Sequence, residues 1–303
     1  MILQGVAGLA AAGATSLVIL IAWKVVDGAR PSISKFGLAF VWHDVWNPVV
    51  GREAYGAASF LFGTVITSFF ALLLATPLAL GIALFLTELA PRVIRGPVTA
   101  LVETLAAVPS VVIGLWGILV LGPALRSNIE HWLHSGLGFI PLFGRQSAAG
   151  ASIFTAIVVL AIMILPIVSS ISRELFLGVP PELKEGALAL GTTRWEMVRG
   201  VVLSSTRPGI TATMILGLSR ALGEAIAVTQ VIGGGSASII SGNFFNNGDT
   251  IASRIAGDFL GATSTNETAS LFYLAVILLV FGLAANLAAQ LIVRRYDLTH
   301  RTH

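Results

Sequence analysis

Residues 151–171 read ASIFTAIVVLAIMILPIVSSI, twenty-one residues without one charged side chain. A helix needs about 20 mainly apolar residues to cross roughly 30 Å of hydrocarbon, so this stretch predicts a membrane-spanning helix. Five further stretches have the same character. The six predicted spans cover Leu3 to Val25, Ser59 to Leu86, Val98 to Leu121, Ala151 to Ile171, Gly209 to Ile232 and Ala269 to Val293. Strands of membrane β-barrels alternate over about ten residues, whereas these runs are continuous, so we expect an all-α polytopic fold.

The composition supports a membrane protein. Of 303 residues, 55% are hydrophobic and only 11% are charged, whereas soluble domains carry about 25% charged residues. A soluble enzyme, a nucleic-acid-binding module and a disordered scaffold are therefore excluded. There is no cysteine, and the five histidines fall in loops or in the C-terminal tail without an acidic cluster at metal spacing, so we expect no metal site. No Gly-x-x-x-x-Gly-Lys-Ser/Thr sequence occurs, which means that this chain cannot hydrolyse ATP alone.

The distribution of basic residues predicts the orientation. Short stretches between or after the spans would lie on one side and hold ten of them: Arg92, Arg95, Arg173, Lys184, Arg194, Arg199, Arg207, Arg294, Arg295 and Arg301. Lysine and arginine accumulate in short cytoplasmic loops. Six spans put both termini on one side, so the predicted orientation is N-in and C-in.

Three ionisable residues fall inside predicted spans at positions that bulk water cannot solvate: Glu103 in the third, and Arg220 and Glu224 in the fifth. A charge at the bilayer centre costs about 2.5–3.5 kcal/mol on insertion scales, so each is expected to face protein or water. Arg220 lies about twelve residues, or roughly 18 Å, inside its span, and Glu224 follows it at i+4 on the same helical face.

Two interpretations of these charges remain open. The pair can simply neutralise itself so that the helix inserts, with Glu103 as a second acceptor. Alternatively, Arg220 is the cation of a translocation path for an oxyanion, since guanidinium offers a rigid fork of donors, and the carboxylates compete with that anion. Ser110 adds weak support, because a helix interruption at Pro109 would present its hydroxyl and backbone donors to the anion, although a simple kink explains it equally well.

Residues 178–204 form the most organised polar segment. Pro180 and Pro181 suit the first turn of a helix, and Gly191 suits the position just after its end. Thr193 and Glu196 stand three residues apart as a capping box that begins a second short helix. The apolar stripe of this second helix starts at Trp195. We therefore expect a helix, a turn and a helix on the cytoplasmic face.

This segment resembles the EAA loop of bacterial ABC importer permeases. The residues that carry the resemblance are Glu185, Gly186, Ala187, Gly191, Val201 and Leu203. Gly186 replaces the first alanine of that pattern and Ser204 its proline. The stretches 85–91, 103–117, 161–166 and 218–228 further resemble the permeases of phosphate importers, and the outer segments around Trp42 and Phe139 are more similar to the PstC type than to the PstA type.

The resemblance implies a function and partners. It implies a type I ABC importer permease fold, one transmembrane domain over residues 1–303, and a coupling loop over 178–204 that docks on an ATPase. It also implies a heterodimer with a PstA-type permease, two copies of a PstB-type cytoplasmic ATPase that carries ATP and Mg, and an extracytoplasmic PstS-type phosphate-binding protein. Arg220 and Glu224 match the charged pair of that family's anion path. This chain itself would hold no cofactor.

A different class of function also fits the charges. A secondary, proton-coupled anion transporter would work without an ATPase and would use Glu103 and Glu224 as proton sites. Uptake by the isolated chain, driven by a pH gradient, distinguishes this alternative from an ATP-driven subunit.

Overall fold

A computed structural model describes residues 2–49, 51–145, 150–234, 240 and 242–300. Arg301, one of the ten basic residues used for the orientation, lies outside this part of the chain. Among the described residues, six helical segments are long and apolar enough to cross a membrane. They are Val6–Phe36, Ala58–Leu89, Ser110–Leu137, Ile153–Leu177, Arg194–Gly223 and Thr265–Leu291. The prediction of an all-α fold with six candidate spans is therefore confirmed.

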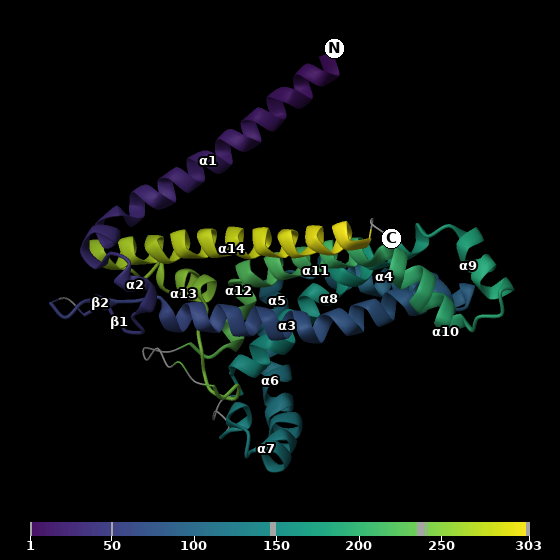
Figure 1. The fold of residues 1–303 in the computed structure, drawn as a ribbon. Coiled ribbons are helices and arrows are strands. Elements are labelled where there is room, and N and C mark those ends of the chain that lie inside the picture. Colours follow the sequence, from purple (N-terminus) through teal and green to yellow (C-terminus); the bar gives the residue numbers. More distant parts are fainter. Residues whose placement is uncertain (1, 50, 146–149, 235–239, 241, 301–303) are drawn as a thin grey trace.

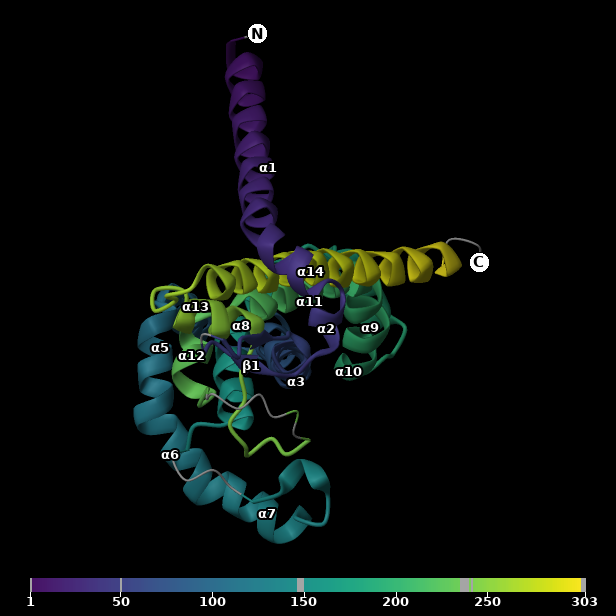
Figure 2. The same ribbon diagram turned by 90° about the vertical axis from the view of Figure 1, so that its left-hand side faces the viewer.

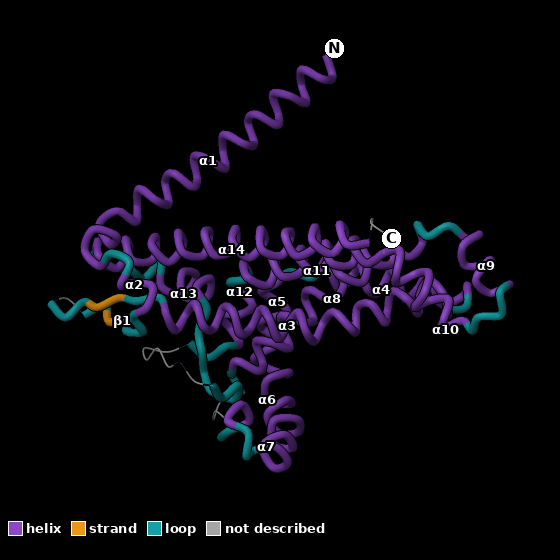
Figure 3. The backbone as a smooth tube through the Cα atoms, in the orientation of Figure 1, coloured by secondary structure: helices purple, strands orange, loops and turns teal. Residues whose placement is uncertain are grey.

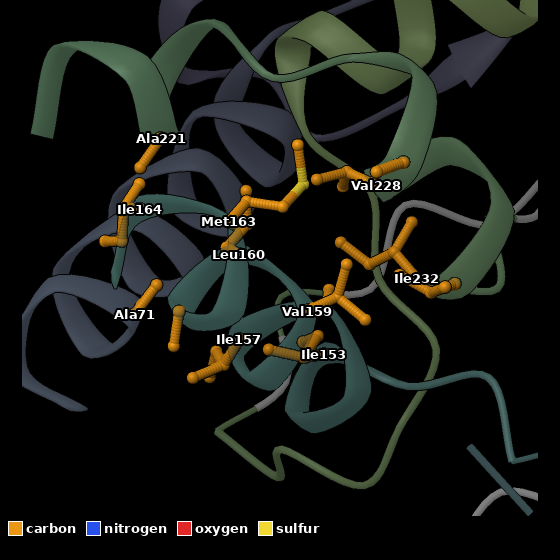
Figure 4. Packing of buried hydrophobic residues seen from close by; sticks show 14 of the residues in the cluster. Ala71, Ile153, Ile157, Val159, Leu160, Met163, Ile164, Ala221, Val228 and Ile232 are labelled. Atoms are coloured by element: carbon orange, nitrogen blue, oxygen red, sulfur yellow. The ribbon is translucent and has the colours of Figure 1, made fainter. Parts of the chain in front are cut away.

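The centre of the molecule is a bundle of four helices: α3 (Ala58–Leu84), α8 (Ile153–Leu177), α11 (Leu203–Gly223) and α14 (Thr265–His300). Small residues on α3 recur every fourth position, and Ala71, Ala75, Ala79 and Ala83 are all fully buried. Such a stripe lets two helix backbones approach closely, which is how helices associate in lipid. Ala71 and Ala75 share one apolar cluster with Leu160 and Ile164 of α8 and with residues after α11 (Figure 4).

Helix α8 shows how local sequence sets its limits. Ser152 precedes it, and the Ser152 hydroxyl accepts a hydrogen bond from the backbone N–H of Thr155 at 3.1 Å. Serine at this position satisfies one of the free donors of the first turn. The helix ends at Leu177 and contains Pro166 without a break. The predicted span of 151–171 is therefore confirmed, and the helix continues beyond it to Leu177.

The bundle has two distinct ends (Figures 1 and 3). One end carries α2 (Ala39–Trp42), α13 (Ile251–Asp258) and an antiparallel hairpin of β1 (Trp46–Asn47) and β2 (Ala54–Tyr55). The opposite end carries α9 (Pro181–Ala189) and α10 (Arg194–Met197). Helix α1 (Ile2–Phe36) touches α14 near the hairpin end, where the Ser32 and Ser270 hydroxyls lie 3.1 Å apart, and then projects away from the bundle.

The predicted third span, Val98 to Leu121, is wrong. Helix α4 (Arg92–Ala107) ends before Pro109, and a new helical segment begins at Ser110. A proline disfavours helical geometry at the preceding residue and supplies no N–H, and Val108 is accordingly extended, with ψ 127°. The new segment runs through η2 (Gly117–Leu121), α6 (Gly122–Ala124), η3 (Leu125–Glu130) and α7 (His131–Leu137).

This second segment stays helical to Leu137 and so continues past Leu121, where the third span was predicted to end. It runs across the long axis of α3 and α14, not along it. Figure 1 shows α6 and α7 leaving the bundle at its side, and Figure 2, viewed along the bundle, shows α5 (Ser110–Trp116) to α7 curving around it.

The predicted fifth span, Gly209 to Ile232, is wrong at both ends. Helical structure begins at Arg194 and continues through η5 (Val198–Val202) into α11. The helix that begins after the capping box is therefore not a separate short helix. It continues past Ser204 into α11. At the other end, the chain leaves the helix at Glu224 and α12 (Ile226–Val231) follows as a separate element.

Candidate functional site

The break between α11 and α12 holds the predicted charged pair. Arg220 lies in the last turn of α11, and Glu224 is the residue at which the backbone becomes extended, with φ −73° and ψ 116°. Nη2 of Arg220 lies 3.9 Å from Oε2 of Glu224. The predicted juxtaposition is therefore present, but the two residues sit at the end of a helix, not on one face of a continuous one.

The surroundings of the two side chains differ. The Arg220 side chain is 46% exposed in the isolated chain, whereas that of Glu224 is 10% exposed. The carbonyls at the end of α11 favour a cation in the last turn. Oε1 of Glu224 also accepts a hydrogen bond of 3.4 Å from the N–H of Ala227, so this carboxylate satisfies one backbone donor in the first turn of α12.

The distance within the pair determines what it can do. At 3.9 Å, Arg220 and Glu224 attract each other without a hydrogen bond, so guanidinium donors stay available to another acceptor. An oxyanion could engage these donors in the bidentate manner that guanidinium favours. The carboxylate would then be the competitor that such an anion has to displace.

Ser110 and Glu103 are placed differently by the break at Pro109. Ser110 opens α5, as a helix interruption at this point predicts. Glu103 lies on α4, a helix without any buried residue, and its side chain is exposed. The third candidate span in the structure begins at Ser110, so Glu103 lies outside it, and no ion pair among the described residues joins Glu103 to Arg220. The prediction that Glu103 is an intramembrane partner of the pair therefore lacks support from the geometry.

The segments after the two breaks pack on each other. A Cβ atom at Gly114 of α5 would lie 2.8 Å from Cα of Ala227 in α12 and 2.9 Å from Oε1 of Gln230. Such proximity is possible only for glycine. Because Ala227 also donates to Glu224, this close contact fixes the element on which the carboxylate rests.

The coupling loop has the predicted local structure. Helix α9 begins at Pro181, and Gly191 has a positive φ of 87°, as expected for the residue after a helix end. The capping box is complete, since the Thr193 hydroxyl accepts from the Glu196 N–H at 3.3 Å and the Thr193 N–H donates to Glu196 Oε2 at 2.7 Å.

The outward face of this loop includes residues singled out by the sequence. Glu185, Gly186 and Glu196 are exposed, and Trp195 is 64% exposed. Ala187, in contrast, is half-buried against a cluster of Phe176, Val179, Met197, Val198 and Val202. The loop is thus anchored by one side and presents the other to solvent.

Sequence reasoning missed several polar contacts. Glu130, which lies outside all six predicted spans, is 1% exposed and accepts a hydrogen bond of 3.0 Å from the Ser152 hydroxyl. Ser219 donates to Asn286 Oδ1 at 2.6 Å and joins α11 to α14 beside Arg220. Such partners are distant in sequence, so no local pattern indicates them.

Arg254 of α13 forms a second charged group at the hairpin end. Its Nε lies 2.8 Å from Asp258 Oδ2, and its Nη1 lies 3.4 Å from Asp249 Oδ2. The guanidinium also stands 5.3 Å from the Trp46 ring and 5.4 Å from the Phe60 ring, within cation–π distance. Burial raises the pKa of both Asp249 and Asp258, and Arg254 opposes that rise.

Comparison with known proteins identifies the family. Residues 75–298 match the family described as binding-protein-dependent transport system inner membrane component. This chain belongs to that family. With its six candidate spans, the permease is a multi-pass protein of the inner membrane.

The permease has close relatives in distant organisms. It is 41% identical over 274 residues to the phosphate transport system permease protein PstC of Pasteurella multocida, covering 89% of this chain and 84% of that protein. It is 41% identical over 288 residues to PstC 2 of Mycobacterium tuberculosis, covering 93% and 88%. The probable PstC of Methanocaldococcus jannaschii is 33% identical over 283 residues, covering 92% and 89%.

Solved structures support the fold. A chain of the bacterial alginate ABC transporter, in complex with an alginate-bound periplasmic protein, matches with a TM-score of 0.60, 17% identity and 93% coverage of both chains. A chain of the inward-facing MetNI methionine transporter matches with a TM-score of 0.52 and 18% identity, covering 77% of this chain and 90% of that one. The fold is therefore that of an ABC importer permease.

Proposed function

We propose that this permease is one half of the translocation path of an ATP-driven phosphate importer. The observation that carries the proposal is the Arg220–Glu224 pair at the break between α11 and α12, in a chain whose relatives are phosphate transport permeases. Arg220 would bind the phosphate oxyanion, Glu224 would compete with it, and Ser110 at the start of α5 would contribute a hydroxyl. The proposed role of Glu103 is weaker, because Glu103 lies on exposed α4.

The proposed partners follow from the same relatives. They are a PstA-type permease, two PstB-type ATPase subunits that carry ATP and Mg, and a PstS-type phosphate-binding protein. The coupling loop would dock on the ATPase through Glu185, Gly186, Trp195 and Glu196, which face solvent, with Gly191 and Thr193 shaping the turn between its helices. Both termini would lie in the cytoplasm, and the whole chain would form one transmembrane domain.

Arg220→Gln tests the proposal. Reconstituted with its partners in proteoliposomes, this variant is expected to assemble normally and to lose ATP-driven phosphate uptake, because a neutral amide cannot replace the cation. Arg207→Gln is the matched control, since it removes an exposed charge from the same helix. Arg220→Lys keeps the charge but loses the planar fork, and we expect it to recover only part of the uptake.

Two results would contradict the proposal. Normal uptake by Arg220→Gln at normal assembly would exclude the cation from the path. Phosphate uptake by the isolated chain in liposomes, driven by a pH gradient without an ATPase, would instead favour the secondary transporter.

A further inference from the structure

One ion pair ties the coupling loop to the end of helix α3. Nζ of Lys184 in α9 lies 2.7 Å from Oε1 of Glu88 in η1 (Phe85–Leu89), the π-helical continuation of α3. The same Nζ donates to the carbonyl oxygen of Phe176 in α8 at 3.2 Å. A single ammonium group therefore joins three elements, two of which are 96 residues apart in the chain.

The Lys184–Glu88 pair is mostly shielded from water, so its loss is expected to affect stability. The side chains of Lys184 and Glu88 are 18% and 12% exposed. Fully exposed pairs contribute little to stability, but removing one partner of a mostly buried pair leaves the other charge desolvated and unpaired. The contact is therefore expected to persist when α9 moves.

Apolar packing alone does not hold α9 to η1. Between them lies a cavity of about 510 Å³, whose walls include Leu84 and Leu89 on one side and Leu188 and Trp195 on the other. Glu88 and Lys184 line this same cavity. The ion pair is the polar contact that bridges this cavity, beside the apolar cluster against which Ala187 of α9 and Leu84 of α3 both pack.

The two faces of α9 make different contacts. Lys184 points inward to Glu88, whereas the next residue, Glu185, is exposed on the face that would meet an ATPase. Successive residues on a helix point about 100° apart, so one rigid helix can hold both contacts. A displacement of Glu185 would therefore also displace Lys184 and, through the ion pair, Glu88, because α9 moves as one rigid helix.

We infer that Lys184 and Glu88 are positioning residues that transmit movement of the coupling loop to α3 during transport. This inference rests on the proposed function and names the route by which that site would be driven. The receiving segment is a π-helix, an irregular hydrogen-bond register that is frequent at functional positions in helices. Displacement of Glu88 would act on the end of α3, the helix whose alanine stripe packs in the core.

The test uses the complete reconstituted complex. Lys184→Gln and Glu88→Gln are each expected to assemble and to hydrolyse ATP, but to transport about tenfold fewer phosphate ions per ATP, a loss within the usual range of coupling between sites. The double variant K184E/E88K restores the opposite charges and is expected to recover most of that ratio. Glu182→Gln removes an exposed carboxylate from the same helix and serves as the control.

Each outcome is decisive. A wild-type transport ratio in both single variants would overturn the inference. Loss of assembly in the single variants and in K184E/E88K alike would also overturn it, because the pair would then only support folding. If the wild-type complex shows no ATP-driven phosphate uptake, the proposed function fails, whereas normal wild-type uptake with unaffected variants refutes only the Lys184–Glu88 link.

Discussion

The contact between α5 and α12 makes Gly114→Ala the most informative substitution. The added methyl group would stand 2.8 Å from Cα of Ala227, which is backbone and cannot rotate away as the end of a side chain can. Restoring an ordinary contact of 3.4 Å requires the two helices to separate by about 0.6 Å. Because Ala227 binds the Glu224 carboxylate, that separation changes the position of Glu224 relative to Arg220.

The magnitude follows from two opposing effects. Replacing glycine by alanine inside a helix stabilises it by about 1 kcal/mol, whereas overpacking a tight contact costs about 1–3 kcal/mol. We therefore expect Gly114→Ala to lower the free energy of unfolding by up to about 2 kcal/mol. Phosphate uptake should fall more than stability, because a misplacement of this size affects the geometry of a binding site directly.

Two other glycines provide the matched series. Gly81 of α3 has nothing within 4 Å of its would-be Cβ, so Gly81→Ala is expected to be neutral or stabilising. A Cβ at Gly217 of α11 would lie 3.1 Å from a methyl group of Val168, and this side chain can shift slightly. The loss of stability and of uptake in Gly217→Ala should therefore lie between those of the other two variants. Thermal unfolding of the purified complex and uptake in proteoliposomes measure both quantities. If Gly114→Ala matches Gly81→Ala in both assays, the α5–α12 contact does not position the site.

Three further changes test other parts of the permease. Glu185→Lys should weaken co-purification with the ATPase, while Glu182→Lys on the same helix should not; equal binding by both variants would contradict the docking face. Glu130→Gln keeps an acceptor for Ser152, so Glu130→Ala should be less stable than Glu130→Gln by about 1–3 kcal/mol in denaturant unfolding, and equal stability would refute that role. Arg254→Gln should destabilise the fold more as the pH rises, because burial raises the pKa of Asp249 and Asp258 and, without the guanidinium, these carboxyls lose stability when they ionise in the fold. A pH-independent loss would contradict this.

The coupling loop was predictable because its rules are local. Pro181, Gly191 and the Thr193–Glu196 box each act within one helical turn, and all three occur where the sequence indicates them. The break at Pro109 follows from the same kind of rule, although hydropathy alone extends the apolar run across it. Segment 125–137 was left outside the predicted spans because it is polar, yet it is helical, and Glu130 within it is buried and bonded to Ser152.

The break at Glu224 was not predictable in this way. No proline lies near it, and apart from Gly223 the residues from Leu218 to Val228 fit a continuous helix. Its cause is tertiary. A Cβ at position 114 would stand 2.8 Å from Cα of Ala227, so only glycine lets α12 pack this closely, and the Glu224 side chain takes over the Ala227 N–H that a continuous helix would satisfy internally. Neither contact is local, so the sequence pattern shows the charges but not the discontinuity that brings them to a helix end.

The fifth helix is longer than predicted, and its length has a consequence for coupling. Helical structure runs without interruption from Arg194, next to the capping box, to Gly223. At 1.5 Å per residue, Arg194 and Arg220 are about 39 Å apart along this one element. Glu224 lies beyond its end and is held instead by α12. A displacement of the coupling loop along this helix therefore moves Arg220 directly, because no loop lies between them. Glu224 does not move with it, since it is held by α12, which packs on α5. Such a displacement therefore changes the distance between Arg220 and Glu224.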